Sequence, residues 1–304
     1  MVGRIGIIGY SEGNGHPFSF SAIVNGYDEA GFAQAGWPVI HDYLKRQPNT
    51  NFGFEGFRVT RAWTQDPALT ARLCAACKID AAVEDPEAMI DDIDSVIIAR
   101  DDWESHLMLA KPFLRAGKKV FIDKPLTLDA AELAAFRPYL EQGQLMCTSG
   151  LRYACELQAG EDHVAEIGSV RLISATVLNG LVKYGIHMIE AAAGLGLGTP
   201  VSFTRLEATH EAYHITLSGG AIMSLNCLGS VGKTFRMSLF GDRDHRHFDL
   251  HDNFCAFRRT LGRFLEMVKT GLPPIPAEEV LTIQTGLAAA SRLAPGETVR
   301  VEAP

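Results

Sequence analysis

The first half of the chain alternates short apolar runs with longer amphipathic stretches. Short apolar runs are typical of strands buried on both faces of a parallel sheet, and the stretches between them have the length of helices. The pattern predicts strands at residues 5–8, 58–62, 96–99, 120–122 and 145–147, and helices at 67–77, 103–116 and 129–142. It therefore indicates an α/β domain whose parallel sheet is covered by helices.

The pattern changes after about residue 150. Successive strands joined by short turns are expected at residues 170–178, 201–208, 212–217, 221–226, 235–240 and 247–250, followed by helices at 254–269 and 277–290. This order predicts an α+β domain with a large, mainly antiparallel open sheet. We therefore expect two domains, residues 1–150 and 151–304. The segment of residues 26–56 is longer than a simple crossover helix requires. We expect it to form a lid or a subunit contact, or else a helix followed by a surface loop.

Composition narrows the class of partner. The chain has 304 residues, of which 47% are hydrophobic and 21% charged, as in an ordinary two-domain globular protein. A net charge of -8 argues against a nucleic-acid partner, because phosphate binding needs clustered Lys and Arg. Strand-like residues begin near the N-terminus, and no apolar run is long enough to span a bilayer. We expect a cytoplasmic protein that acts on a small molecule, away from membranes.

The cysteines and histidines indicate no metal site. The six cysteines are scattered along the chain and are expected to be free thiols in a reducing compartment. His245, His247, Asp249 and His251 alternate along one predicted strand, which is typical of a polar edge strand. We therefore predict no bound metal.

Two short segments carry the candidate chemistry. The apolar run at residues 120–122 ends in Asp123-Lys124-Pro125, which places an ammonium group at the carboxyl edge of the sheet, where open α/β sheets bind ligands. Lys183 and His187 lie at helical spacing in the second half. A cation that polarises an oxygen and an imidazole that moves a proton suit chemistry on a carbonyl or hydroxyl group.

These segments resemble the glucose-fructose oxidoreductase / inositol dehydrogenase / rhizopine catabolism family of nicotinamide-dependent enzymes. Asp123-Lys124-Pro125 matches the family's Glu-Lys-Pro motif, and Lys183 with His187 matches its Asp-x-x-x-His motif. Residues 94–99 with His106, and residues 150–153, extend the likeness over most of the chain. The resemblance implies a Rossmann domain that binds NAD or NADP, a sugar-like substrate, and a homodimer or homotetramer. It also implies catalytic roles for Lys124, His187 and Lys183, and a cofactor contact for Asp123.

The loop after the first strand departs from the usual dinucleotide-binding pattern. Glycines there let the backbone approach the pyrophosphate at a helix N-terminus. The loop starts correctly at Gly9, but Ser11 replaces the second glycine, and Gly13 and Gly15 miss the usual third position. We expect a backbone-amide nest of different shape, to which Asn14 adds a donor.

The second strand lacks the acidic residue that binds the adenosine ribose. Thr64 occupies its expected place. Loss of the acid removes repulsion against a 2′-phosphate, and Arg61 or Arg72 is a candidate to pair with one, so the expected cofactor is NAD or NADP.

Lys183 stands where the family has an aspartate that holds and activates the histidine. A cation there disfavours protonation of His187. Lys183 either tunes the site or binds an anionic sugar acid or sugar phosphate. Arg152, Tyr153 and His16 are expected to contact the substrate.

The sequence thus predicts an NAD(P)-dependent oxidoreductase that transfers a hydride between nicotinamide and a secondary alcohol or ketone of a sugar, cyclitol or sugar acid. Two alternatives follow from the same resemblance. One is a non-catalytic dinucleotide-binding regulatory or interaction protein. The other is an NAD-assisted glycosidase.

Overall fold

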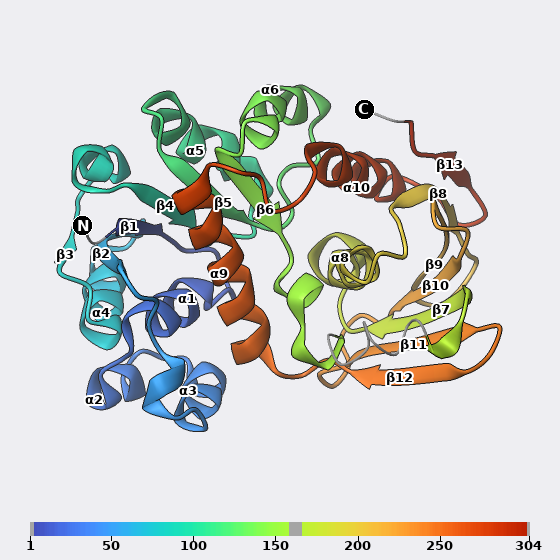
Figure 1. Ribbon diagram of the computed structural model, residues 1–304, viewed down its shortest axis with the longest axis horizontal. Coiled ribbons are helices and arrows are strands. Elements are labelled where there is room, and N and C mark those ends of the chain that lie inside the picture. The colour runs from blue at the N-terminus through green and yellow to red at the C-terminus, as the bar shows by residue number, and fades with distance from the viewer. Residues whose placement is uncertain (1–2, 158–165, 303–304) are drawn as a thin grey trace. The chain divides into compact units, whose positions relative to one another are not determined.

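The structure is a computed structural model that describes residues 3–157 and 166–302, and the chain divides into two compact units (Figure 1). Unit 1 comprises Met1–Leu126, Ala135–Cys147 and Leu261–Pro274, and unit 2 comprises Thr127–Ala134, Thr148–Thr260 and Ile275–Pro304. Unit 1 therefore takes in a late segment of the chain that a single division at residue 150 does not include.

Unit 1 is built on a six-stranded sheet in the order β3-β2-β1-β4-β5-β6. Strands β1 to β5 pair in parallel with their neighbours. All four residues of β4 are buried, as expected for a strand covered on both faces. The predicted parallel α/β sheet is therefore confirmed. The strands are β1 (Gly3–Ile8), β2 (Phe57–Trp63), β3 (Ala81–Ala82), β4 (Ser95–Ile98), β5 (Lys119–Asp123) and β6 (Leu145–Thr148).

The helices of this half begin and end at residues suited to those positions. Helix α4, for example, starts at Pro67, where a missing N–H costs nothing, and Asp66 caps it by accepting a 2.9 Å hydrogen bond from the Ala68 N–H. Residues 26–56 contain two short helices and a 3₁₀ turn. The helices are α1 (His16–Asn25), α2 (Glu29–Ala33), α3 (Pro38–Lys45), α4 (Pro67–Cys77), α5 (His106–Arg115) and α6 (Ala130–Glu141), and the 3₁₀ segments are η1 (Asn49–Asn51), η2 (Pro86–Asp92) and η3 (Trp103–Ser105).

Unit 2 is built on a seven-stranded sheet in the order β12-β11-β7-β10-β9-β8-β13. Most neighbours are antiparallel, but β7 and β10 are parallel, so the sheet is mixed. The predicted mainly antiparallel sheet is therefore confirmed. The parallel pair arises because the chain leaves the sheet after β7 and returns beside it later. The strands are β7 (Val170–Val177), β8 (Pro200–Arg205), β9 (Glu211–Leu217), β10 (Ile222–Cys227), β11 (Phe235–Gly241), β12 (His245–Asp249) and β13 (Thr298–Arg300).

The two faces of this sheet differ. On β7, Ile173, Ala175 and Val177 are fully buried in a core to which the helices also contribute, whereas Leu172 and its register partner Ile222 are 39% and 47% exposed. Helices α8 and α10 pack on strands of the sheet. Across the described ranges, no helix has the length and apolarity needed to cross a bilayer. The remaining elements are η4 (Gly150–Tyr153), η5 (Leu181–Gly185), α8 (Ile186–Gly194), α9 (Asn253–Thr270) and α10 (Ala277–Ala290).

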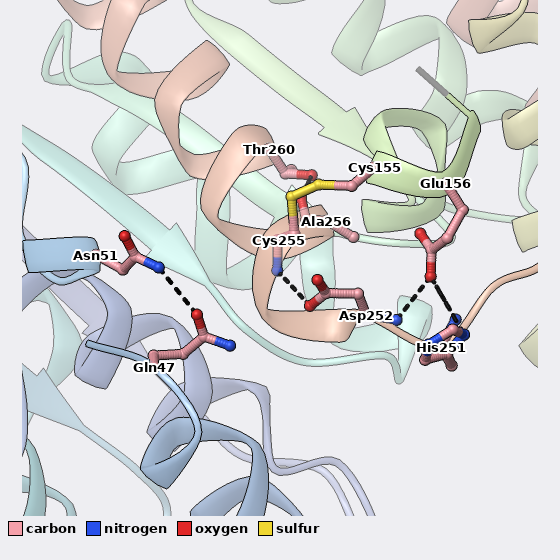
Figure 2. Close-up of a disulfide and its surroundings, with 9 residues drawn as sticks. All are labelled: Gln47, Asn51, Cys155, Glu156, His251, Asp252, Cys255, Ala256 and Thr260. Atoms are coloured by element: carbon pink, nitrogen blue, oxygen red, sulfur yellow. Dashed lines mark hydrogen bonds and ion pairs between the residues drawn. A yellow bond between two sulfur atoms is a disulfide. The ribbon is translucent and has the colours of Figure 1, made fainter. Parts of the chain in front are cut away.

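One disulfide corrects the prediction for the cysteines. Cys155 and Cys255 are bonded to each other within unit 2 (Figure 2). The expectation that all six thiols are free is therefore wrong for this pair. The two residues are 100 positions apart, so only the fold shows that they meet.

Candidate active site

The Asp123-Lys124-Pro125 triplet ends strand β5, as predicted, and its two charged residues are buried. Asp123 and Lys124 are each 3% exposed. The Asp123 carboxylate lies 2.5 Å from His16 Nδ1 and accepts hydrogen bonds from Asn14 Nδ2 at 3.2 Å and from the Lys124 N–H at 3.0 Å. The structure thus brings together four residues that the sequence analysis assigned to cofactor, substrate and catalysis.

These contacts keep the carboxylate ionised. Burial alone would raise the pKa of Asp123, but the charge and hydrogen bond of His16, the charge of Lys124 and the hydrogen bond from Asn14 hold that pKa well below its usual range. Asp123 therefore supplies a fixed negative charge beside the loop that follows β1.

That loop needs glycine at two places. Gly13 has φ = +76°, in the left-handed region that side chains rarely adopt. At Gly15, a Cβ atom would lie 2.4 Å from Ile40 Cδ1 and 2.7 Å from the Trp37 ring. Ser11, in place of the usual second glycine, binds Asp101 Oδ1 at 2.5 Å and accepts the Asp101 N–H at 3.1 Å. The loop is therefore tied to the segment after β4.

The N-terminus of helix α1 offers few donors to an anion. The His16 N–H donates to Asn14 Oδ1 at 2.9 Å, and Pro17 has no N–H. The Phe18 and Ser19 N–H groups both donate to the Gly15 carbonyl at 3.1 Å. A pyrophosphate at this helix would have to rely on other donors in the loop, in contrast to the usual arrangement.

The end of β2 is also organised differently from the expectation. Thr64 is 3% exposed, and its hydroxyl is 2.7 Å from the Asp66 carbonyl and 2.8 Å from Thr70 Oγ1. Arg61 donates to Asp92 at 3.0 Å. Both residues predicted to face the ribose or its phosphate are therefore engaged by neighbours, and their cofactor roles stay predictions.

Gln65, which the sequence analysis missed, contacts the loop after β1. Its amide donates to the Tyr10 carbonyl at 2.6 Å and accepts from the Tyr10 N–H at 2.9 Å. Arg100 donates to the same side chain at 3.0 Å and pairs with Asp102 at 2.6 Å. No short motif marks Gln65. Its position directly after Thr64 was the available signal.

His106 supports the segment that follows Lys124. The buried ring places Nδ1 2.9 Å from the Leu126 carbonyl and Nε2 3.1 Å from the Arg100 carbonyl. Burial, the largest influence, lowers the pKa of His106, although both backbone hydrogen bonds raise it. His106 thus joins the ends of β4 and β5 through their following loops.

The second half of the predicted site lies in unit 2. Lys183 lies in η5, and His187 follows in the first turn of α8, so the predicted helical spacing is present. His187 Nδ1 is 2.5 Å from the hydroxyl of Ser149, which is fully buried and also accepts the Leu151 N–H at 3.0 Å. The His187 ring meets Tyr184 and Phe235 edge-on, with centroids 5.7 and 5.8 Å apart.

Ser149 is thus a second residue that the sequence analysis missed. It directly precedes the segment 150–153, which carries part of the family resemblance, and that position was the only signal. The family resemblance implies an aspartate at position 183 that holds His187. In this chain the neutral hydroxyl of Ser149, from another segment, contacts His187 instead.

Arg152 and Tyr153 lie in η4. Arg152 is 9% exposed and pairs with Glu190 at 2.6 Å and with Glu279. Thr148 donates to the same Glu190 carboxylate at 2.9 Å. The Arg152 guanidinium therefore stabilises the interior of unit 2. Substrate contacts by Arg152 and the half-buried Tyr153 stay predictions.

Comparison with known proteins identifies the class of the first unit. Residues 30–151 match the Gfo/Idh/MocA family, described as an oxidoreductase family with an NAD-binding Rossmann fold. This match confirms, over these residues, the resemblance to the family that the sequence motifs indicated. The predicted nicotinamide dinucleotide domain is thereby confirmed as well.

Solved structures extend the likeness of fold to the whole chain. Myo-inositol 2-dehydrogenase from Lactobacillus plantarum is 16% identical, with 99% of this chain and 100% of that chain covered and a TM-score of 0.74. Scyllo-inositol dehydrogenase from Lactobacillus casei, solved with NAD(H) and scyllo-inositol, is 17% identical, with 99% of each chain covered and a TM-score of 0.75. No curated protein matches the sequence.

The buried carboxylate of Asp123 yields a prediction for stability. Asp123→Asn leaves Lys124 and His16 without their anion and should lower the free energy of unfolding by about 3 kcal/mol in urea denaturation at neutral pH. The folded pKa of Asp123 is lowered, so its stabilisation is present above the unfolded pKa of about 4 and is lost as the pH falls toward the folded pKa. The difference between wild type and variant should therefore narrow below about pH 4.

Asp94→Asn is the matched control, since Asp94 pairs with Arg4 at 3.6 Å where both side chains are 47% exposed. It should cost at most about 1 kcal/mol. Equal costs for the two variants would contradict a special role for the buried carboxylate.

Proposed function

We propose that the protein is an NAD(P)-dependent dehydrogenase or reductase that acts on a secondary alcohol or ketone of a sugar, cyclitol or sugar acid. The observation that carries the proposal is the buried ammonium residue Lys124 at the carboxyl end of β5, in an NAD-binding Rossmann fold. Ligands of such sheets bind at this edge. The inositol dehydrogenases of similar fold support a polyol-like substrate.

The proposed roles follow from charge and geometry. The nicotinamide, when bound, accepts or supplies the hydride. Lys124 donates a hydrogen bond to the substrate oxygen and stabilises the alkoxide charge that develops there. His187 exchanges the hydroxyl proton at Nε2, because Ser149 engages Nδ1. We also propose that the protein works as a homodimer or homotetramer.

Lys183 determines which substrates fit this scheme. In the proposal its ammonium group attracts the carboxylate or phosphate of an acidic sugar, while Ser149 takes over the orienting role of the family's aspartate. A sugar acid or sugar phosphate is therefore the substrate class to test first.

One observation favours a second candidate function. The donors at the start of helix α1 are already bonded to Asn14 and Gly15, which weakens the usual pyrophosphate site. A dinucleotide-binding regulatory protein of the same fold would tolerate this loss. It would bind a cofactor but would turn over no free sugar, so turnover assays separate the two functions.

Replacement of Lys124 tests the proposed chemistry. Lys124→Ala removes a donor that matters most in the transition state, so kcat should fall about a hundredfold or more. Cofactor affinity, measured by calorimetry, should change little. The assay follows the formation of reduced nicotinamide with a panel of sugars, cyclitols and sugar acids.

Lys119→Ala is the control, because Lys119 begins the same strand and donates to the Gly143 carbonyl at 2.6 Å. This variant should keep wild-type kcat. Full activity in Lys124→Ala would show that Lys124 does not touch the reacting oxygen.

Ser149 and Lys183 can be tested together. Ser149→Ala should lower kcat about tenfold and displace the pH–rate profile, because His187 loses the hydroxyl at Nδ1. Adding Lys183→Asp to Ser149→Ala should recover part of kcat with a neutral substrate. The same substitution should raise KM for an acidic sugar much more than for a neutral analogue.

Ser238→Ala serves as the control, since Ser238 makes a similar 2.7 Å contact with His247 Nδ1 on the β11–β12 pair. It should leave kinetics unchanged. The proposed role of Ser149 is wrong if Ser149→Ala also leaves the kinetics unchanged. The proposed role of Lys183 is wrong if Lys183→Asp raises KM equally for neutral and acidic substrates.

The end of β2 yields a prediction for cofactor choice. With Thr64 and Gln65 in place of a carboxylate, calorimetry should give dissociation constants for NAD(H) and NADP(H) within about tenfold of each other. Gln65→Glu should weaken NADP(H) selectively by about tenfold or more, because a carboxylate repels the 2′-phosphate. Thr64→Val should leave the ratio unchanged. Strong preference of the wild type for NAD(H) would refute the inference from this strand.

A further inference from the structure

A cluster of metal-ligating groups lies in unit 2 and includes none of the candidate active-site residues. It consists of Cys155, which follows η4, and of Asp252 and Cys255 at the start of helix α9 (Figure 2). The two sulfur atoms and one carboxylate oxygen all lie within 4.8 Å of one another, and all three residues are half-buried. In the part of the chain that the structure describes, no other group of three such residues meets this geometry.

The cluster is held in place by contacts other than the bond between its sulfurs. Glu156 Oε1 accepts the N–H groups of His251 and Asp252 at 2.8 and 2.9 Å, which fixes the segment before α9 against the residue next to Cys155. Asp252 Oδ1 accepts the Cys255 N–H at 3.0 Å as the cap of α9. Reduction of the disulfide therefore leaves the three ligand groups close together.

The negative charge that a cation needs at this point comes from the ligand groups themselves and from the neighbouring Glu156. Glu156 Oε1 lies 3.6 Å from His251 Nδ1, whereas the buried Oε2 accepts no hydrogen bond from the described residues. The N-terminus of α9 favours the thiolate form of a cysteine in its first turn. Two thiolates and a carboxylate form a ligand set that suits zinc, with a fourth tetrahedral position left for water.

We propose that Cys155, Asp252 and Cys255 bind a zinc-type divalent cation when the two cysteines are reduced. Binding of the cation releases the two thiol protons, and each thiolate sulfur then coordinates the ion through an electron pair. The disulfide is the alternative state of the same two sulfurs. Thiol–disulfide exchange with oxidised glutathione forms the Cys155–Cys255 bond, yields two glutathione thiols and releases the cation. The cation and the disulfide take no part in the proposed hydride transfer.

The test uses the full-length protein, reduced and then desalted under anaerobic conditions. Titration with Co²⁺ should produce a thiolate-to-cobalt absorption band that saturates at one equivalent, and Zn²⁺ should displace it. Elemental analysis after desalting should find about one zinc per chain. Protein treated with oxidised glutathione should bind neither ion at this site.

Matched variants locate the ligands. Cys155→Ser and Cys255→Ser should each abolish the band, and Asp252→Asn should weaken binding at least about tenfold while keeping the cap of α9. Cys74→Ser is the control, because Cys74 is a half-buried free thiol in α4 of unit 1. It should bind the ion like the wild type.

Circular dichroism shows whether each variant is folded. If a cysteine variant does not fold, Asp252→Asn still tests the site. The proposal is overturned if reduced wild type binds no more Co²⁺ or Zn²⁺ than the Cys155→Ser/Cys255→Ser double variant. It is equally overturned if Asp252→Asn binds as tightly as wild type, or if reduction of the two cysteines unfolds the protein.

Discussion

Asp123 keeps an ionised carboxylate inside unit 1, at the end of strand β5. An unpaired buried charge costs several kcal/mol, so the surrounding groups must compensate for it. His16 and Asn14 do so from the loop after β1, and the Lys124 N–H does so from the neighbouring peptide. One anion therefore joins the loop expected to face the cofactor to the residue expected to face the substrate oxygen.

This arrangement has a consequence for cofactor binding. Asn14 compensates Asp123 with its amide and uses its oxygen to accept the first N–H of helix α1. The same side chain thus fixes the buried anion and occupies a donor that a pyrophosphate would otherwise use. In unit 2, Ser149 makes a comparable substitution, because it engages His187 where the family resemblance implies an aspartate. Each unit thus contains a residue expected to be catalytic, Lys124 or His187, and surrounds it with partners other than the usual ones.

Most of the fold could be predicted because the spacing of hydrophobic residues and the positions of turn residues can be read directly from short stretches of sequence. Helix α4 was predicted at its observed residues, and every strand of unit 1 except the two-residue β3 was predicted within a few positions. The parallel pairing of β7 with β10 and the bond between Cys155 and Cys255 depend on segments that are distant in sequence, so no local pattern shows them. Lys124 and His187 were recognisable from motifs, whereas Ser149 and Gln65 act through contacts that only the folded chain creates.

The central claim is hydride transfer from a secondary alcohol to the nicotinamide, and isotope transfer tests it most directly. A polyol, cyclitol or sugar acid deuterated at the carbinol carbon is incubated with the protein and oxidised cofactor, and the reduced cofactor is analysed by mass spectrometry. We expect the reduced nicotinamide to carry the deuterium with wild type and with Lys119→Ala, and to carry almost none with Lys124→Ala. Cofactor binding without label transfer from any of these substrates would contradict it.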